Sequence, residues 1–295
     1  MMDQAEALRK MVSSLDLSTA YTPGRREARI LAVSSGKGGV GKSNFTLNFA
    51  LALKKMGRKV LVFDADIGMG NIDVLMGVRS RYNFLHLIRG EQKIRDIVES
   101  GPEELSYIAG GSGLTELFNL SESDIDYFTR QLEEVSSEMD FIIFDTGAGL
   151  SKENLQFITA ADECFIVTTP EPTAITDAYA LMKVVYELEK KVNFKLVINR
   201  AADEREGIQT ADKLSLVARK FLNLDVPLLG VISDDVHVMQ AVKKQVPFSL
   251  AFPNSPAARD IQRLALRYMA VPSTTDTGTV MGIKGFMQKW LRRTK

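Results

Sequence analysis

Short, almost uninterrupted runs of apolar residues recur along the chain from residue 30 onward, separated by longer stretches with helical patterning. Val, Ile, Leu and Phe dominate these runs, as is typical of strands in a parallel sheet that is covered on both faces. Strands that alternate with helices predict an α/β fold, with a doubly wound, mainly parallel sheet and helices on both faces. The six predicted strands are ILAVS (30–34), KVLVFD (59–64), FIIFD (141–145), CFIVTT (164–169), KLVIN (195–199) and LLGVI (228–232).

Helical patterning fills the segments between these strands, most clearly over residues 42–56 and 173–190. A later helix is predicted over residues 254–269, where Ser255 can cap the helix and Pro256 suits the first turn. The stretch after it is rich in Ser, Thr and Gly, which is typical of a linker. The chain is therefore expected to contain a partly helical segment at 1–29, an α/β domain at 30–270, a linker at 271–280 and a basic amphipathic helix at 281–295.

The composition of the chain is that of an ordinary globular protein. Apolar residues make up 45% of the 295 residues and charged residues 25%, and 37 basic side chains balance 37 acidic ones. This balance argues against nucleic acid as a partner. The single cysteine, Cys164, excludes an internal disulfide and fits a reducing cytoplasm. No apolar run reaches the roughly 18 residues of a membrane span, and no secretory signal is recognised near Asp3 and Glu6, so a cytoplasmic location is expected.

A glycine-rich loop joins the first predicted strand to the helix that follows it. Gly36, Gly41, Lys42 and Ser43 match the phosphate-binding pattern G-x-x-x-x-G-K-[ST] without a gap. Glycines let backbone N–H groups turn toward an anion, and the start of a helix adds partial positive charge. We expect Lys42 to reach the β- and γ-phosphates and Ser43 to bind Mg²⁺; the alternative is a turn that binds nothing. The predicted nucleotide-binding residues of the loop are Gly36, Lys37, Gly38, Gly39, Val40, Gly41, Lys42, Ser43 and Asn44.

The loop contains a second lysine, Lys37, although one lysine is enough to bind phosphate. Lys37 could reach the phosphates of its own site or those of a facing subunit. In the second case it would act as an arginine finger does when a partner supplies it. A solvated surface lysine is the alternative. We predict that Lys37 and Lys42 both contribute to catalysis.

Acidic residues follow two of the apolar strands, at the carboxyl ends where open α/β sheets bind ligands. Asp64 ends one strand, and Asp66 lies two residues later, so the two carboxylates are expected to point in different directions and to differ in function. One of them is expected near Mg²⁺ and the other near the attacking water. Asp145 ends another strand and suits Mg²⁺ binding, directly or through water. Aspartates that only cap turns are the alternative.

Two glycines after Asp145, Gly147 and Gly149, suit a mobile segment that senses the γ-phosphate. The predicted ligands of Mg²⁺ are one hydroxyl from the phosphate loop and two strand-end carboxylates: Ser43, Asp64 and Asp145.

Polar residues at two later strand ends are candidates for contacts with the nucleoside. The amide of Asn199 can pair with the edge of adenine, Arg200 can stack on the base, and Asp234 follows the next strand. Such residues are as often ordinary loop residues, so both interpretations stay open. The chain lacks the guanine-reading pattern N-K-x-D, which favours ATP over GTP.

These motifs resemble those of the MinD/ParA family of deviant Walker A ATPases. GKGGVGKS (36–43) is similar to the family's phosphate loop, DADIGMGNIDVLMG (64–77) to its second motif and FIIFDTGAG (141–149) to its Walker B motif, in the same order. The resemblance covers residues 30–270 and implies an ATPase that binds Mg²⁺ with ATP or ADP. It implies an ATP-dependent homodimer in which Lys37 contacts phosphate across the interface. It also implies that Asp66 positions water, that Asp64 supports the metal and switch region, and that Asn199 reads adenine.

The first residues of the chain resemble the FlhG group of that family, also called YlxH or FleN, whose members control flagellum number and placement. FlhG proteins have an N-terminal D-Q-A-x-x-L-R stretch that MinD lacks. In that group the stretch stimulates the FlhF GTPase, so the resemblance implies FlhF and flagellar switch proteins as partners. A frayed terminal helix is the alternative. The implied partner-binding residues are Asp3, Gln4, Ala5, Leu8 and Arg9.

The last 15 residues combine an apolar helical face with several basic residues and no acid. This is the composition of a helix that lies on an anionic membrane surface. One such helix should bind weakly, but two on one dimer should bind far better, which would couple the nucleotide state to the inner face of the cell membrane. A helix docked on its own domain is the alternative, and release on dimerisation would reconcile the two. The predicted membrane-binding residues are Ile283, Phe286, Met287, Trp290 and Leu291.

Other function classes fit the sequence less well. A MinD-type division-site ATPase would lack the N-terminal stretch, and a ParA-type DNA-segregation ATPase would need a basic surface. A relative that binds metal clusters would need more cysteines than Cys164. A purely structural protein would leave Lys42 and the strand-end acids without a purpose. The leading prediction is therefore a membrane-associated ATPase of the FlhG type.

Overall fold

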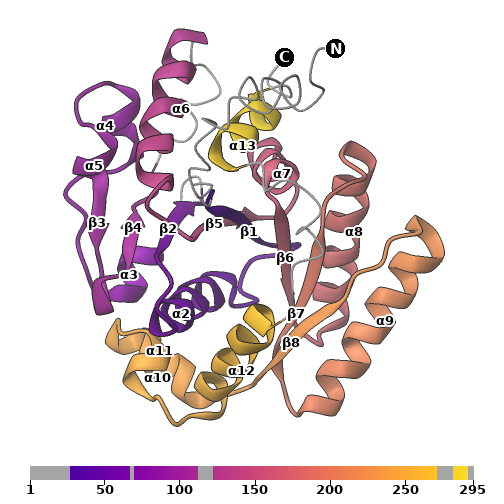
Figure 1. The fold of residues 1–295 in the computed structure, drawn as a ribbon. Helices are drawn as coiled ribbons and strands as arrows, with labels where there is room; N and C mark the ends of the chain where they lie inside the picture. The colour runs from indigo at the N-terminus through magenta and orange to yellow at the C-terminus, as the bar shows by residue number, and fades with distance from the viewer. Residues whose placement is uncertain (1–26, 67–69, 112–121, 271–281, 292–295) are drawn as a thin grey trace, which may run out of the picture.

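The sheet of the molecule lies between two layers of helices (Figure 1). The computed structural model describes residues 27–66, 70–111, 122–270 and 282–291. Within these residues, one eight-stranded sheet has the order β3-β4-β2-β5-β1-β6-β7-β8, and all neighbouring strands are parallel except β3 and β4. This confirms the predicted doubly wound fold. The strands are β1 (Arg29–Ser35), β2 (Val60–Ala65), β3 (Val98–Ser100), β4 (Ser106–Ile108), β5 (Phe141–Ala148), β6 (Glu163–Thr168), β7 (Phe194–Ala201) and β8 (Leu228–Ser233).

Each face of the sheet has its own apolar core, because the side chains of a buried strand alternate between the two faces. One core lies under α2 (Lys42–Lys55), α3 (Ile72–Met76), α10 (Val236–Lys244), α11 (Phe248–Ala251) and α12 (Pro256–Ala270). The other lies under α4 (Phe84–Ile88), α5 (Ile94–Ile97), α6 (Glu122–Ser136), α7 (Lys152–Ala160), α8 (Pro172–Leu188), α9 (Glu204–Leu222) and α13 (Gly282–Leu291).

The six predicted strands are all present, and the predicted helices agree with the structure to within two residues at the ends of α2 and α8. The hydroxyl of Ser255 accepts a hydrogen bond from the N–H of Ala258 at 3.3 Å, so the expected cap of α12 is confirmed. The sequence pattern did not predict β3 and β4. Each has only three residues, and the segment between them contains Gly101 and Pro102, a pair that is typical of turns.

The order of the strands brings the predicted site residues together. β1 lies at the centre of the sheet and pairs with both β5 and β6, so the loop after β1 meets the ends of several strands. β2 pairs with β5, and Asp64 lies directly beside Asp145 in that pairing. Because the strands are parallel, all these ends open at the same edge of the sheet.

The apolar face of α13 packs on the domain. Ile283, Phe286, Met287 and Trp290 are all buried. The ring of Phe286 stacks on Phe144 of β5, with 4.8 Å between ring centroids and 6° between planes. The docked alternative therefore describes this structure. The side chain of Leu291, like Asp3, Gln4, Ala5, Leu8 and Arg9, lies outside the described residues. Across the described part of the chain, no helix is both long enough and apolar enough to span a membrane.

Candidate active site

The phosphate loop runs from β1 to the first turn of α2 and passes close to α8. Gly41 precedes α2 with a φ of 90°, a left-handed conformation that favours glycine. Gly36 lies against the backbone of α8, where an added Cβ would come within 2.2 Å of the carbonyl carbon of Asp177. The loop therefore needs glycine at one position for its turn and at the other for close packing.

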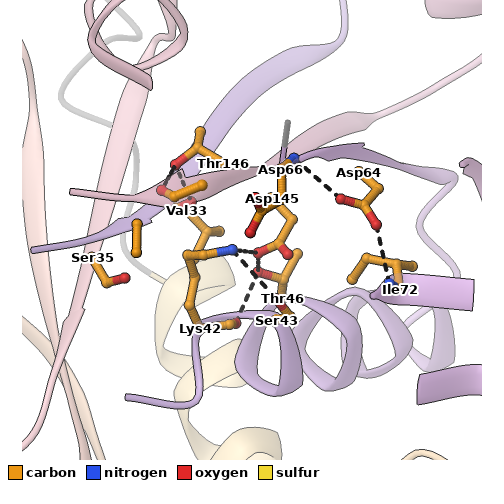
Figure 2. Close-up of polar contacts among 12 residues, drawn as sticks. Val33, Ser35, Lys42, Ser43, Thr46, Asp64, Asp66, Ile72, Asp145 and Thr146 are labelled. Atoms are coloured by element: carbon orange, nitrogen blue, oxygen red, sulfur yellow. Dashed lines mark hydrogen bonds and ion pairs between the residues drawn. The ribbon is translucent and has the colours of Figure 1, made fainter. Parts of the chain in front are cut away.

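Lys42 and Asp145 form a buried ion pair beneath the loop (Figure 2). The Nζ atom of Lys42 lies 2.9 Å from Oδ1 of Asp145 and 3.3 Å from the hydroxyl of Ser43, and the lysine and aspartate side chains are 7% and 1% exposed. The hydroxyl of Thr46 donates a second hydrogen bond to the same carboxylate oxygen at 2.7 Å. Since leaving a buried charge unpaired costs several kcal/mol, the pair holds Lys42 in place. The pattern matched Lys42 but not Thr46, which lies one helical turn further along α2.

Asp64 holds the backbone that follows β2. Its carboxylate accepts hydrogen bonds from the N–H groups of Ile72 at 3.1 Å and of Asp66 at 3.2 Å (Figure 2). Burial raises the pKa of Asp64 to about 7, and the neighbouring Asp145 carboxylate adds to the rise. The carboxylate of Asp64 is thus bonded to the backbone of two residues that follow β2. Its assignment as a metal ligand stays a prediction.

Asp66 faces the cavity above the phosphate loop and is half-buried. Burial raises its pKa above the ordinary value; Lys42 acts against this rise and Asp145 adds to it. An added Cβ on Gly147 would lie 3.3 Å from Oδ1 of Asp66 and 2.9 Å from Oδ1 of Asn154, so the three residues crowd together. The end of β5 is also held in place, because the Asn154 amide donates to the carbonyl of Ala148 at 3.1 Å.

The raised pKa of Asp64 predicts how stability depends on pH. The folded chain holds this proton up to about pH 7, whereas the unfolded chain releases it near the ordinary value of 3.8. Between these values the folded state binds more protons, so the free energy of unfolding falls as pH rises. From about pH 5 to about pH 8, the nucleotide-free wild type should lose about 1–3 kcal/mol relative to Asp64→Asn. Urea denaturation at four pH values measures this difference. Parallel pH profiles for the two proteins would contradict it.

Two adjacent cavities lie above the sheet edge. One of about 620 Å³ includes Lys42, Ser43 and Asp66. The other, of about 440 Å³, is lined by Asn199 and Arg200, and mostly apolar side chains of α10 complete it. The cavities share lining residues from the loop and α10: Gly39, Gly41, Asn44 and Val242. The cavity with Lys42, Ser43 and Asp66, called the polar compartment for these three side chains, and the apolar compartment beside α10 meet at the phosphate loop. This arrangement suits the phosphates and the base of one nucleotide.

The predicted nucleoside residues line the apolar compartment. The amide of Asn199 donates to the carbonyl of Val40 at 2.7 Å, which ties β7 to the phosphate loop. Arg200 has a φ of 57° and lies 3.8 Å from the carboxylate of Asp234. All three residues are part of the compartment wall, so the structure brings them together as expected. Their contacts with a base stay a prediction.

Lys37 lies at the rim of the site and is 35% exposed. Its Nζ atom contacts Oε2 of Glu171 at 3.0 Å and the hydroxyl of Thr173 at 3.1 Å. The sequence pattern did not identify these partners, because they lie 134 and 136 residues from Lys37 along the chain. One sequence signal could have identified them as site residues: both follow the buried strand β6, at the sheet edge where such folds bind ligands.

The site also fits a magnesium ion that arrives with a nucleotide. The described residues contain no group of three His, Cys, Asp or Glu side chains that could hold a metal on its own. The hydroxyl of Ser43 and the carboxylate of Asp145 are nevertheless oxygen donors within one site. Mg²⁺ commonly takes only one or two protein ligands beside phosphate oxygens and water, so this donor set suits it.

Known proteins are similar to this chain in sequence and in fold. The family described as an AAA domain matches residues 28–198. The antiactivator FleN of Pseudomonas aeruginosa is 35% identical over 244 residues, which cover 83% of this chain and 87% of FleN. The flagellum site-determining protein YlxH of Helicobacter pylori is 36% identical over 279 residues, which cover 92% of this chain and 93% of YlxH. Among solved structures, a chain of the MinC:MinD cell division complex of Aquifex aeolicus matches with a TM-score of 0.68 and 25% identity. The match covers 83% of this chain and 98% of that one.

Proposed function

Since this chain belongs to the MinD/ParA family of P-loop ATPases, in the group of FleN and YlxH, we propose that it is a dimerising ATPase that regulates flagellum number and placement. The observation that supports this proposal most directly is the pair of adjacent cavities above the loop of Lys42. A nucleotide that spans them would place its phosphates over α2 and its base against α10. The similarity to FleN and YlxH over most of their length supports the flagellar part of the proposal.

Lys42, Ser43, Asp66 and Asp145 would have separate tasks in hydrolysis. Backbone N–H groups of the loop and the start of α2 attract the phosphates, and Lys42 neutralises charge that develops on the γ-phosphate. Ser43 and Asp145 would hold Mg²⁺, which supplies further positive charge at the phosphates. Asp66 accepts a hydrogen bond from the attacking water and orients it. A carboxylate is a weak base even with a raised pKa, so hydrolysis is expected to be slow.

Exposed apolar side chains around the cavities support dimerisation over the nucleotide. Val74 and Leu150 lie beside the polar compartment, and Val236 and Met239 lie on α10 beside the apolar one. All four are exposed in the single chain. A second copy facing the same edge would cover them and bring its own Lys37 to the phosphates. Such an arrangement makes ATP part of the interface.

The docked α13 supports a membrane contact that dimerisation controls. Its apolar face is buried, while Lys284 is exposed and Lys289 is half-buried. If ATP-bound dimers release the helix, two copies of this face would insert into anionic lipid together. Phe286 stacks on Phe144, the residue before Asp145, so a change at the nucleotide site can reach the docked helix through β5.

Flotation with anionic vesicles tests the membrane part of this proposal. The wild type should float with ATP about tenfold more than with ADP, because paired helices bind far more tightly than one. A chain shortened before Gly282 should stay in the soluble fraction with either nucleotide. Gln288→Ala, at an exposed position of α13, is the matched control and should float like the wild type. Equal flotation of the wild type with both nucleotides would contradict the proposal.

The proposed partners outside the dimer are the FlhF GTPase and flagellar switch proteins. FlhF would bind the N-terminal residues Asp3, Gln4, Ala5, Leu8 and Arg9, which lie outside the described part of the chain. The support for both partners is the similarity to FleN and YlxH.

A further inference from the structure

Four side chains of alternating charge form a row across the top of the site. Lys37 contacts Oε2 of Glu171 at 3.0 Å, and Oε1 of the same carboxylate lies 4.0 Å from Arg200. Arg200 in turn lies 3.8 Å from Asp234. Since Arg200 and Asp234 line the apolar cavity, the row connects the phosphate loop to the compartment for the base.

The middle of this row is fixed to the loop by backbone packing. Glu171 precedes the first turn of α8, and Thr173 lies within that turn. The same helix packs so closely on Gly36 that a Cβ there would come within 2.2 Å of the backbone of Asp177. The start of α8 therefore cannot move away from the loop without losing this contact, and it presents both Lys37 partners at a constant position.

We propose that Glu171 and Thr173 form a clasp that holds Lys37 on its own subunit, and that the clasp sets how readily two subunits associate. This inference rests on the proposed ATP-dependent dimer, in which Lys37 reaches the partner's phosphates. Lys37 cannot bond Glu171 and Thr173 and also extend across an interface. Each association therefore opens two clasps, one on each subunit. Glu171 and Thr173 are thus positioning residues for Lys37.

The exposure of the clasp makes it a modest restraint. Glu171 is 50% exposed and Lys37 35%, and exposed ion pairs contribute little stability. Opening one clasp should weaken the association of two subunits by about two- to fivefold. The bonds that Lys37 would form with the partner's triphosphate can outweigh this cost. Because two clasps open per dimer, the factors multiply.

Two substitutions test the clasp by dimerisation. With a slowly hydrolysed ATP analogue, Glu171→Gln should lower the dimer dissociation constant by about four- to twenty-fivefold, the product of two clasps. Thr173→Val removes a hydroxyl without changing charge and should lower it by about twofold. Glu187→Gln, an exposed glutamate on the same helix, should match the wild type. Sedimentation velocity over a range of protein concentrations gives these constants. An unchanged or higher dissociation constant for Glu171→Gln overturns the proposal. A lower constant for Glu171→Gln with an unchanged constant for Thr173→Val also overturns it, since the change would then come from the net charge of the protein alone.

A second measurement examines the clasp in the nucleotide-free single chain. Mass spectrometry should show that Lys37 is acetylated about two- to fivefold faster in Glu171→Gln than in the wild type or Glu187→Gln. Equal rates overturn the clasp. A wild type that stays monomeric with the ATP analogue would instead refute the proposed dimer, while the acetylation rates would still decide whether the clasp exists.

Discussion

Asp66→Ala is expected to slow ATP hydrolysis by about a hundredfold to a thousandfold while ATP stays bound. The residue lines the polar cavity, but the groups that hold phosphate are the loop backbone and Lys42. Removing the carboxylate therefore removes the group that orients water and leaves the binding site intact. Without hydrolysis, the dimer should accumulate with ATP and disappear with ADP.

Release of phosphate and gel filtration with light scattering measure both effects. Asp212→Ala, at an exposed position of α9, is the control and should hydrolyse ATP like the wild type. An Asp66→Ala protein that turns over ATP at the wild-type rate would show that another group orients the water. Hydrolysis lost together with ATP binding would instead show that Asp66 is needed to build the site.

Lys37→Ala is expected to keep nucleotide affinity and to weaken the ATP dimer by about a hundredfold or more. A charge-assisted hydrogen bond contributes about 1.5–3 kcal/mol, and a symmetric dimer would lose two of them. In the single chain Lys37 bonds Glu171 and Thr173 at the rim, whereas Lys42 forms the buried pair at the centre of the site. The substitution should therefore leave nucleotide binding by the monomer unchanged.

Fluorescent ADP titration and sedimentation velocity separate these two properties. Lys183→Ala removes an exposed lysine from α8 and is the matched control. If Lys37→Ala dimerises like the control, the lysine does not act across an interface. If it loses ADP affinity, Lys37 binds phosphate in its own subunit.

The parts of the molecule that the sequence predicts are those with a local signal. The six long strands are buried apolar runs. Lys42 lies in a motif whose residue spacing is typical of a phosphate-binding loop. Gly41 has the left-handed backbone that this motif needs. The parallel order follows from strands alternating with helices, so the gathering of Asp64, Asp66 and Asp145 at one edge could be foreseen.

The rest depends on contacts between distant segments. Glu171 and Thr173 reach Lys37 only because α8 packs on the loop, which no local pattern reveals. The hydrogen bonds from Ile72 and Asp66 that occupy the Asp64 carboxylate also depend on the folded loop. An amphipathic helix has the same pattern whether it faces lipid or protein, so sequence alone left the docking of α13 open.

The adjacency of Phe144 and Asp145 on β5 has a consequence for how this protein can change. The ring of Phe144 supports Phe286, and the next residue bonds Lys42, so a shift of β5 would alter both the anchor of α13 and the proposed reaction centre. Random substitutions in β5 that loosen the anchor should also disturb turnover. Genetic screens for the two traits should therefore repeatedly return the same codons, and selection would have little room to adjust one trait alone.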